Sequence, residues 1–341
     1  MNFLSYLTLP NPEVDSTLCK GGYTTKNSRI YRPTRVKPWT DFTIENFNAS
    51  FKDIVLHEMA EPKVRNARDI TPERTIIYEE SGVTDMVAHW NERVVQHALN
   101  GTQPILHREM PGQRFDDGSM YFSKNRGQGH VLNHKNVEQK PDWCLSRVWN
   151  HKINRLCKNY LPGDSKPAKK WNSEWIGSQY MPHKKKSNEV LAQINKYMSL
   201  CETRYGFIIS EHEVVAMRLS KCKHEKEVPD NNQESLEELE SDENEEAAQF
   251  GTLLEYCPIP WATSGTGNLT VNLSLWWLSV LAFQENSIQD EGTYGSLGTR
   301  SRGTQPLQRE HAASLVSKER KSAGGLGVRK SGRIAKRKKG A

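Results

Sequence analysis

Three short motifs in the middle of the chain carry side chains that could do chemistry together. Asp142 closes a Pro-Asp pair, Asp164 and Lys166 form an Asp-x-Lys tripeptide, and Gln193 and Tyr197 form a Gln-x-x-x-Tyr motif. Two neighbouring carboxylates can hold a hard divalent cation through oxygen ligands. A lysine beside them can position or deprotonate a water that the cation activates. These residue types therefore indicate metal-assisted hydrolysis of phosphodiester bonds.

The spacing of the first two motifs determines how they can meet. The separation of Asp142 from Asp164 suits two neighbouring strands joined by a loop. Lys166 follows Asp164 by two positions, so on a strand both side chains face the same side and can share one pocket. The competing interpretation is that Asp-x-Lys is a common tripeptide and usually a surface pair. Gln193 would then be a helix-surface amide and Tyr197 a core aromatic.

The composition predicts one globular domain with poorly ordered ends. The chain has 341 residues, of which 35% are hydrophobic and 26% charged, and its formal net charge is +6. The expected parts are a poorly ordered basic N-terminal segment over 1–70, a domain over 71–285 and a disordered basic tail over 286–341. Residues 224–248 are dominated by Glu, Asp, Asn and Gln, so we expect a disordered acidic insert within the domain.

The apolar spacing predicts the elements that must position the motifs. Val, Trp and Leu recur at helical spacing from Ser81 to Leu99, and Asn100-Gly101 is a typical helix stop. The other expected elements are, in order, a loop over 102–127, strands near 129–132, over 142–148 and at the end of 160–166, a basic loop to 186, a helix over 188–201, a hairpin over 204–219, a strand over 250–256 and an apolar helix over 269–283.

Taken in order, the motifs resemble the PD-(D/E)XK nuclease superfamily, and the Gln-x-x-x-Tyr helix resembles its RecB-like exonuclease branch. Over about residues 71 to 285 the chain looks closest to a group of uncharacterised fungal nuclease-like proteins. The blocks that carry this resemblance are Pro141-Asp142-Trp143, Leu161 to Trp171, Thr203 to Ile209 and Leu254 to Trp261. The resemblance implies an α/β fold with a restriction-endonuclease-like αβββαβ core, in which helices flank a central mixed sheet.

The same resemblance implies roles for individual residues. Asp142 and Asp164 would be ligands of Mg²⁺ or Mn²⁺, and the backbone carbonyl of Ser165 would complete the metal shell. Lys166 would orient or activate the attacking water. Gln193 and Tyr197 would contact that water or the scissile strand. The superfamily adds a glutamate from the first helix, and the candidates that remain open are Glu80, Asp85 and Glu92.

A basic loop after the second motif fits a phosphate-rich ligand. The candidate nucleic-acid-binding residues are Lys169, Lys170, Trp171, Lys184, Lys185 and Lys186. Cationic side chains neutralise phosphates, and aromatic faces can stack on unpaired bases. The alternative is a solvated loop whose tryptophans turn into the core.

Together these features predict a metal-dependent nuclease that acts on DNA through a metal-activated water. One alternative is a catalytically inactive module of the same fold that binds nucleic acid or a protein partner. Another is an adaptor that binds partners through the acidic insert and the tail. The first alternative keeps the fold but not the catalysis.

The remaining features bear on the cellular compartment. The Arg/Lys cluster from Arg329 to Lys339 is typical of a nuclear-targeting signal or a nucleic-acid-binding tail, so an intracellular, nuclear protein is expected. No membrane partner is expected, because the most apolar window, 269–283, is too short to span a bilayer. The six cysteines form no C-x-x-C pair, which predicts reduced thiols rather than a zinc site.

Overall fold

The computed structural model describes the parts of the chain that carry a central sheet and its helices. The described residues are 1–21, 31–60, 70–71, 73, 75–110, 118–124, 131–132, 138–148, 158–222 and 251–298. The acidic insert expected at 224–248 and the basic C-terminal cluster lie outside them. Among the described residues, no helix is long and apolar enough to cross a bilayer, and no cysteine forms a disulfide bond.

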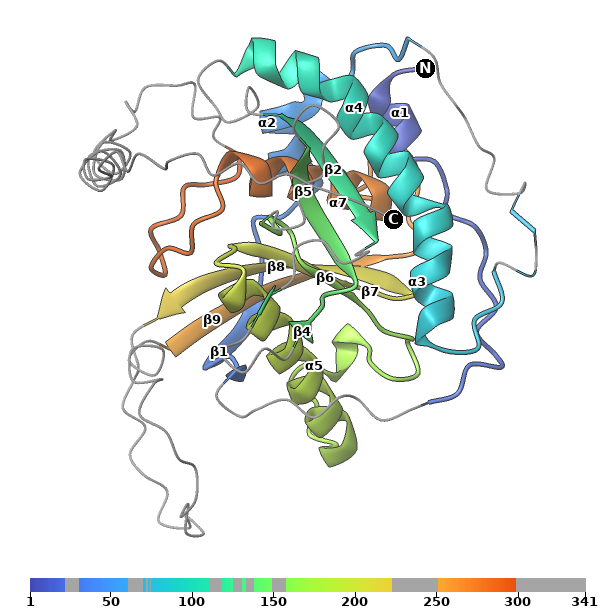
Figure 1. The fold of residues 1–341 in the computed structure, drawn as a ribbon, viewed down its shortest axis with the longest axis vertical. Helices are drawn as coiled ribbons and strands as arrows, with labels where there is room; N and C mark the ends of the chain where they lie inside the picture. Colours follow the sequence, from blue (N-terminus) through green and yellow to red (C-terminus); the bar gives the residue numbers. More distant parts are fainter. Residues whose placement is uncertain are drawn as a thin grey trace, which may run out of the picture. The chain divides into compact units, whose positions relative to one another are not determined.

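A seven-stranded mixed sheet lies at the centre of the fold, with strand order β1-β9-β8-β7-β6-β5-β2 (Figure 1). Its strands are β1 (Arg35–Pro38), β2 (Ser119–Lys124), β5 (Trp143–Val148), β6 (Gly163–Ser165), β7 (Tyr205–Ile209), β8 (Glu213–Cys222) and β9 (Gly251–Pro260). β6 runs parallel to β7, and β1 runs parallel to β9, whereas the other neighbours are antiparallel. The short strands β3 (Val131–Leu132) and β4 (Glu138–Gln139) form a separate pair. The expected mixed sheet is confirmed.

Helices cover both faces of this sheet. The helices are α1 (Phe3–Leu7), α2 (Ile44–Val55), α3 (Glu80–His89), α4 (Asn91–Glu109), α5 (Met181–Leu200) and α7 (Val271–Gln284). Phe207 and Val214 pack into a core shared with α7, whereas their neighbours Ile208 and Val215 pack under α5 on the opposite face. Successive side chains of a strand point to opposite faces, so these strands are apolar on both sides and lie between two helical layers.

The elements around the sequence motifs agree well with expectation. β5 begins directly after Asp142, β6 contains Asp164, and β7 and β8 form the predicted hairpin. The strand expected after the acidic insert is β9, and the apolar helix expected near the end of the domain is α7. Trp276 and Trp277 on α7 are fully buried, as expected for core residues.

The N-terminal segment differs from the expected poorly ordered region. It contributes α1, β1 and α2, and Phe3 and Phe47 are buried in the larger core. The ring of Phe42 stacks on Trp277 of α7 with 4.3 Å between centroids. Large aromatic side chains dominate such packing. The sequence allows a short helix over 42–59, and α2 is that helix, with Phe47, Phe51 and Ile54 at helical spacing on its buried face. α1 and β1 were not expected.

The first predicted helix is divided in two and continues further than expected. α3 ends at His89, α4 begins at Asn91, and α4 runs through the supposed stop at Gly101 and through Pro104. Gly101 lies inside α4 and against the ring of Phe3 of α1. A Cβ at this position would lie 2.5 Å from Phe3 Cζ, so the contact requires glycine. The expected loop over 102–127 is therefore wrong at 102–109, which belong to α4, and at 119–124, which form β2.

The helix expected over 188–201 begins earlier than predicted. α5 starts at Met181, with Pro182 in its first turn, a position where the missing N–H of proline leaves no intrahelical bond unmade. Lys184, Lys185 and Lys186 are therefore helical residues and do not belong to the preceding loop. That loop contains one short 3₁₀ helix, η5 (Ser173–Trp175).

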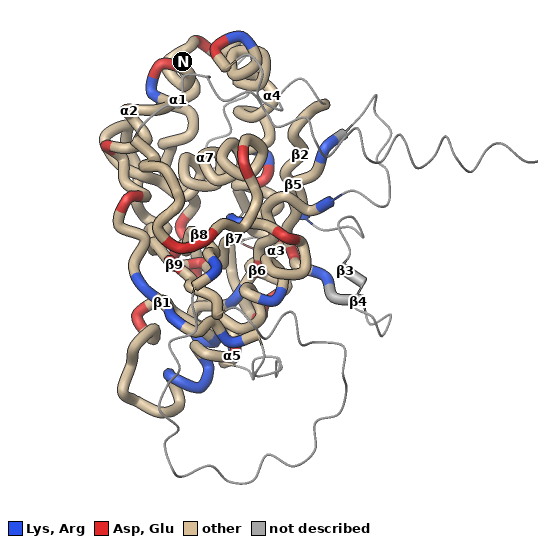
Figure 2. Tube along the Cα trace, turned by 90° about the vertical axis from the view of Figure 1, so that its left-hand side faces the viewer, with Lys and Arg blue, Asp and Glu red and all other residues tan. Residues whose placement is uncertain are grey.

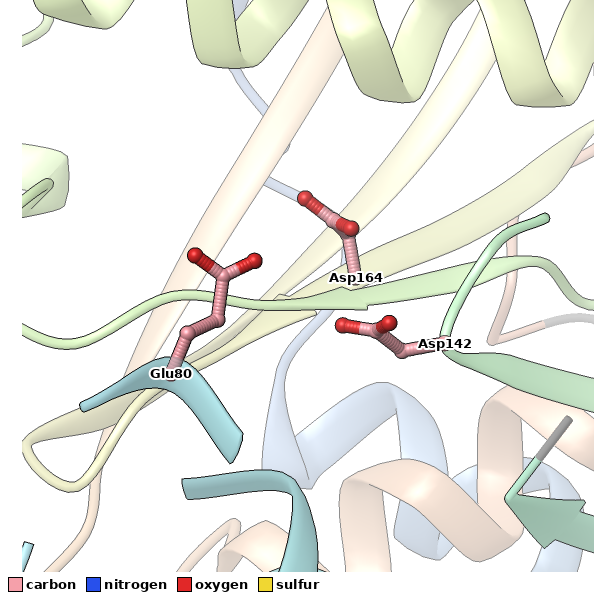
Figure 3. A group of neighbouring side chains, drawn as sticks. All are labelled: Glu80, Asp142 and Asp164. Atoms are coloured by element: carbon pink, nitrogen blue, oxygen red, sulfur yellow. The ribbon is translucent and has the colours of Figure 1, made fainter. Parts of the chain in front are cut away.

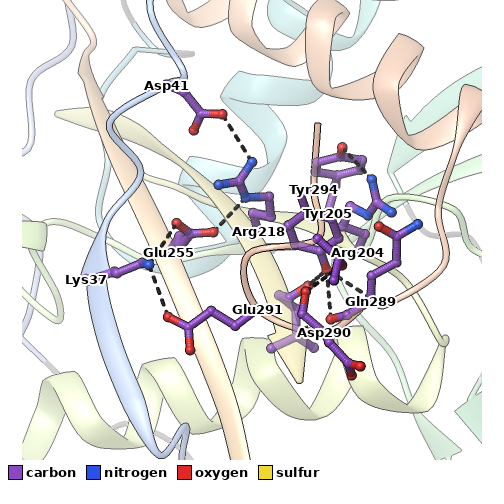
Figure 4. Close-up of polar contacts among 12 residues, drawn as sticks. Lys37, Asp41, Arg204, Tyr205, Arg218, Glu255, Gln289, Asp290, Glu291 and Tyr294 are labelled. Atoms are coloured by element: carbon purple, nitrogen blue, oxygen red, sulfur yellow. Dashed lines mark hydrogen bonds and ion pairs between the residues drawn. The ribbon is translucent and has the colours of Figure 1, made fainter. Parts of the chain in front are cut away.

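An ionic and aromatic network fixes the segment that follows α7. Arg218 on β8 donates through Nε to Glu255 on β9 at 2.6 Å and forms an ion pair with Asp41 at 3.3 Å (Figure 4). The guanidinium groups of Arg204 and Arg218 lie 4.1 and 5.1 Å from the ring centroid of Tyr294. Cation–π contacts of this kind hold residues 286–298 against β7 and β8, so this part of the expected disordered tail is ordered.

Gly163 offers a direct test of the packing around β6. A Cβ at this position would overlap the ring of Phe207, which is fully buried and cannot move aside. We expect Gly163→Ala to lower the free energy of unfolding by about 1–3 kcal/mol, as overpacking does elsewhere. Chemical denaturation measures the change. Gly267→Ala is the control, because a Cβ there meets no atom within 4 Å, and equal losses in both variants would contradict this account of β6.

Candidate metal centre and catalytic lysine

Three carboxylates from separate elements meet beside β6. Glu80 is the first residue of α3, Asp142 directly precedes β5, and Asp164 is the middle residue of β6. One oxygen from each lies within 4.8 Å of the other two, and the three side chains point toward a common space (Figure 3). The two aspartates that the sequence singled out are therefore brought together, with Glu80 as the third member. We call these three residues the acidic triad.

The register of β6 explains why Asp164 points to this place. Gly163 pairs with Phe207 and Asp164 pairs with Ile208 on the parallel neighbour β7. Ile208 belongs to the core under α5, so Asp164 faces the α5 side of the sheet. The side-chain period of two places Lys166 on the same side, as the sequence predicted. The backbone N–H of Lys166 donates to the carbonyl of Ile209 at 2.9 Å, which extends the β6–β7 pairing by one residue.

Lys166 is the buried cation of the site. Its Nζ lies 2.5 Å from Asp164 Oδ2 and donates to Glu80 Oε1 at 2.8 Å and to the carbonyl oxygen of Ser165 at 3.1 Å. Asp164 and Lys166 are only 2% and 3% exposed. Charges buried to this degree require partners, and here each of the two groups supplies the partner of the other.

Burial and the oppositely charged neighbours have opposite effects on the pKa of each group in the site. Burial raises the pKa of Asp164 to about 7, although Lys166 opposes the shift. Burial also raises the pKa of Asp142, against the hydrogen bond that its Oδ2 accepts from the Ser165 N–H at 2.8 Å. For Glu80, burial is outweighed by Lys166 and Lys170, so its pKa is lowered. For Lys166, burial is outweighed by Asp164 and Glu80, so its pKa is raised.

The structure separates the three open candidates for the first-helix acid. Glu80 joins the triad, whereas Asp85 forms an ion pair with Lys124 at 2.7 Å and its side chain is 62% exposed. Glu92 accepts a hydrogen bond from the backbone N–H of Lys124 at 3.3 Å. The sequence could not make this choice because it depends on the angle at which α3 approaches β6.

Gln193 and Tyr197 lie together on the buried side of α5. Gln193 Nε2 donates to the Tyr197 hydroxyl at 3.0 Å, and both residues are less than a tenth exposed. Burial raises the pKa of Tyr197, and the charge of Asp164 raises it further. Within the described chain, Gln193 Oε1 is buried without a hydrogen-bond partner. A buried amide oxygen of this kind is available to a ligand.

The turn that follows β6 brings a second lysine to the site. Lys170 Nζ donates to Glu80 Oε2 at 2.9 Å, so the two oxygens of Glu80 bind two different lysines. The backbone N–H groups of Lys170 and Trp171 both donate to the carbonyl of Pro167, which closes the turn. Sequence reasoning gave Lys170 a general role in phosphate binding and did not place it on Glu80.

Two buried glutamates, which the sequence analysis missed, hold this turn and the loop after it. Both carboxylate oxygens of Glu211 lie 3.1 Å from the Ala168 N–H. Glu213 accepts from the N–H and the hydroxyl of Ser173 at 2.7 and 2.6 Å. Glu211 lies in the polar turn between β7 and β8, and Glu213 is the first residue of β8. That turn looked like an ordinary hairpin connection, and its pairing with a distant loop gave no local signal.

The other predicted nucleic-acid-binding residues have mixed outcomes. Trp171 is fully buried in the core under α5, so its predicted role in base stacking is wrong. Burial of such a large ring stabilises the folded protein. Lys169 Nζ donates to the carbonyl of Thr17. Lys184 and Lys185 are exposed and Lys186 is half-buried near the start of α5, and Lys and Arg positions lie near α5 and β6 in Figure 2.

The donor set of the acidic triad fits a hard divalent cation. Mg²⁺ and Ca²⁺ prefer carboxylate and carbonyl oxygens at about 2.0–2.6 Å, so oxygens on opposite sides of such an ion lie about 4–5 Å apart. The three carboxylates meet this condition. The carbonyl of Ser165 lies beside them, since Lys166 Nζ contacts it together with Glu80 and Asp164.

Comparison with protein-family models, with curated proteins and with solved structures found no match.

The raised pKa of Asp164 predicts how stability varies with pH. The folded protein releases this proton near pH 7, where the ion pair with Lys166 becomes complete, whereas the unfolded chain releases it near 3.8. Folding therefore takes up a proton between these values, and the contribution of Asp164 to stability falls as pH rises through this window. We expect Asp164→Asn to lose this decline, measured as the difference in unfolding free energy between variant and wild type in cation-free buffer at several pH values.

Asp85→Asn provides the matched control, because it changes an exposed acid of α3. A difference between Asp164→Asn and wild type that stays constant across the window would contradict the assigned shift. A difference that grows in the opposite direction would show that the charged form of Asp164 is favoured in the folded protein.

Proposed function

We propose that this protein is a metal-dependent nuclease that hydrolyses phosphodiester bonds of DNA. The observation that carries the proposal is the meeting of Glu80, Asp142 and Asp164 around Lys166. Oxygen donors that suit Mg²⁺ or Mn²⁺, with a buried lysine in contact, are the groups that metal-assisted hydrolysis requires.

The order of elements around the site supports a restriction-endonuclease-like core. A helix (α4) is followed by three strands (β2, β5 and β6) that pair antiparallel, then by a helix (α5) and by β7, which pairs parallel with β6. This is the αβββαβ order that the sequence resemblance implies. In this proposal, β8, β9 and β1 extend the core on the far side of β7.

The chain's own residues have distinct tasks in the proposed reaction. A divalent cation held by Glu80, Asp142, Asp164 and the Ser165 carbonyl would supply positive charge at the scissile phosphate and lower the pKa of a water. Lys166 would orient the attacking water and donate hydrogen bonds to the charge that develops on the phosphate. Gln193, whose Oε1 has no partner among the described residues, would accept a hydrogen bond from the water or the strand, and Tyr197 fixes its amide.

A second candidate is a module of the same fold that binds DNA without cleaving it. The observation that favours it is charge compensation, because Lys166 and Lys170 already neutralise Glu80 and Asp164 without a cation. In such a module the lysines would stay on the carboxylates, and the exposed Lys184 and Lys185 on α5 would contact the phosphates.

Cleavage assays with the purified full chain separate the two candidates. Linear, circular and single-stranded DNA, with an RNA of the same sequence, are incubated with Mg²⁺ or Mn²⁺. We expect metal-dependent cleavage of DNA by the wild-type protein, and a loss of at least about 100-fold in Lys166→Ala, the size expected when a preorganised hydrogen-bond donor to the developing charge is removed. Equal activity in both proteins would remove Lys166 from this role.

A matched pair of acid variants tests the metal site separately from cleavage. Glu80→Gln removes a member of the triad, and Asp85→Asn removes an exposed acid from the same helix. A ligand that binds only the folded state stabilises it, by about 2.7 kcal/mol at 100 times its Kd. We therefore expect Mn²⁺ to raise the Tm of wild type and Asp85→Asn, but not that of Glu80→Gln. No Mn²⁺ effect on wild type, together with salt-sensitive DNA binding, would favour the binding module.

A further inference from the structure

The side chain of Lys170 is held in position by its neighbours, unlike that of a freely exposed surface lysine. Its side chain is only 18% exposed, and Nζ lies 2.9 Å from Glu80 Oε2. The turn that carries it is closed on the Pro167 carbonyl and held from below by Glu211 on the Ala168 N–H. The neighbouring Trp171 is fully buried and anchors the end of the turn. The ammonium group is thus fixed at the edge of the acidic triad.

The partners of the two lysines differ in one respect. Lys166 contacts Glu80, Asp164 and the Ser165 carbonyl. In the described chain, Glu80 is the carboxylate within ion-pair distance of Lys170. A change at Glu80 therefore leaves Lys170 without its carboxylate partner.

A divalent cation at the triad would make that change. Binding to a Glu80 oxygen replaces the attraction that holds Lys170, and the positive charge of the cation repels a second positive charge a few ångströms away. Lys170 would then carry an uncompensated ammonium group at the edge of the site. A phosphate oxygen of the substrate is the anion that could pair with it there.

We propose that Lys170 is a cation-gated phosphate contact. It holds Glu80 in the cation-free protein, and it turns to a non-bridging oxygen of the bound phosphodiester once a divalent cation takes Glu80. This inference rests on the proposed function, because it needs a phosphodiester at the triad. Lys170 is the positioning residue in the first state and a substrate-binding residue in the second.

The competing role for Lys170 is purely structural, as a clamp that keeps Glu80 in place for the cation. The two roles predict opposite changes in cation affinity. If Lys170 competes with the cation for Glu80, its removal tightens cation binding. If Lys170 orients Glu80 for the cation, its removal weakens cation binding.

The experiment uses the full chain with Lys170→Met, Lys170→Arg and Lys37→Met. Lys37 on β1 is the matched control, because it also pairs with carboxylates, Glu255 and Glu291, but on a strand at the other edge of the sheet from β2. Binding of Mn²⁺ without DNA is followed through the electron paramagnetic resonance signal of the free ion. Binding of a short DNA duplex is measured with and without Ca²⁺, a hard cation of the same ligand preference.

We expect Lys170→Met to bind Mn²⁺ about tenfold more tightly than wild type, since one competing charge is removed. We expect Ca²⁺ to strengthen DNA binding by wild type, and this gain to be about tenfold smaller in Lys170→Met, the size of a lost charge-assisted hydrogen bond. Lys170→Arg keeps the charge and should keep most of the gain. Lys37→Met should resemble wild type in both measurements.

The outcomes distinguish this inference from the proposed nuclease activity. Weaker or unchanged Mn²⁺ binding by Lys170→Met overturns the exchange, and an unchanged Ca²⁺-dependent gain overturns the phosphate contact, even if wild type cleaves DNA. Both expected shifts in a wild-type protein that does not cleave support the gated contact and overturn the nuclease. A wild-type protein that binds no Mn²⁺ overturns both.

Discussion

The buried ion pair between Asp164 and Lys166 is the interaction on which the rest of the site depends. Neither charge could remain in this position alone, because an unpaired buried charge is strongly unfavourable. The pair forms because β6 is extended, so that residues two apart point to the same face. The three-residue strand lies between β5 and β7, within the sheet and not at its edge. The position of Asp164 is therefore fixed by hydrogen bonding on both sides before any ligand binds.

The elements farther from the site keep this strand and its lysines in place. The β7–β8 hairpin supplies the parallel neighbour of β6, and its turn supplies Glu211, which holds the backbone between Lys166 and Lys170. On the opposite face, Phe207 packs against Gly163 in the core that α7 and the N-terminal helices share. The N-terminal segment, which was expected to be poorly ordered, thus helps to support the strand that carries Asp164.

The sequence predicted those parts of the structure that depend on local spacing. The strands at Asp142 and Asp164, the β7–β8 hairpin and the apolar helix α7 follow from short apolar runs and turn residues. The shared face of Asp164 and Lys166 follows from the strand period of two. Other features depend on packing between distant segments. Glu80 was one of three equivalent acids until α3 was placed, and Gly101 looked like a helix stop because Phe3, its packing partner, lies far away in the chain. Trp171 could have faced solvent or the core on sequence grounds alone, and the tertiary fold places it in the core.

The charge balance of the site has a consequence for its chemistry. Two lysines compensate the carboxylates, so the fold does not need a metal to bury Asp164. The same compensation must weaken cation binding, because a cation has to replace attractions that are already present. In the proposed exchange, the ammonium group of Lys170 would become available where an anionic phosphate would lie. Under the proposed function, the site would gain affinity for a polyanion when the cation binds, which would couple the binding of cation and substrate.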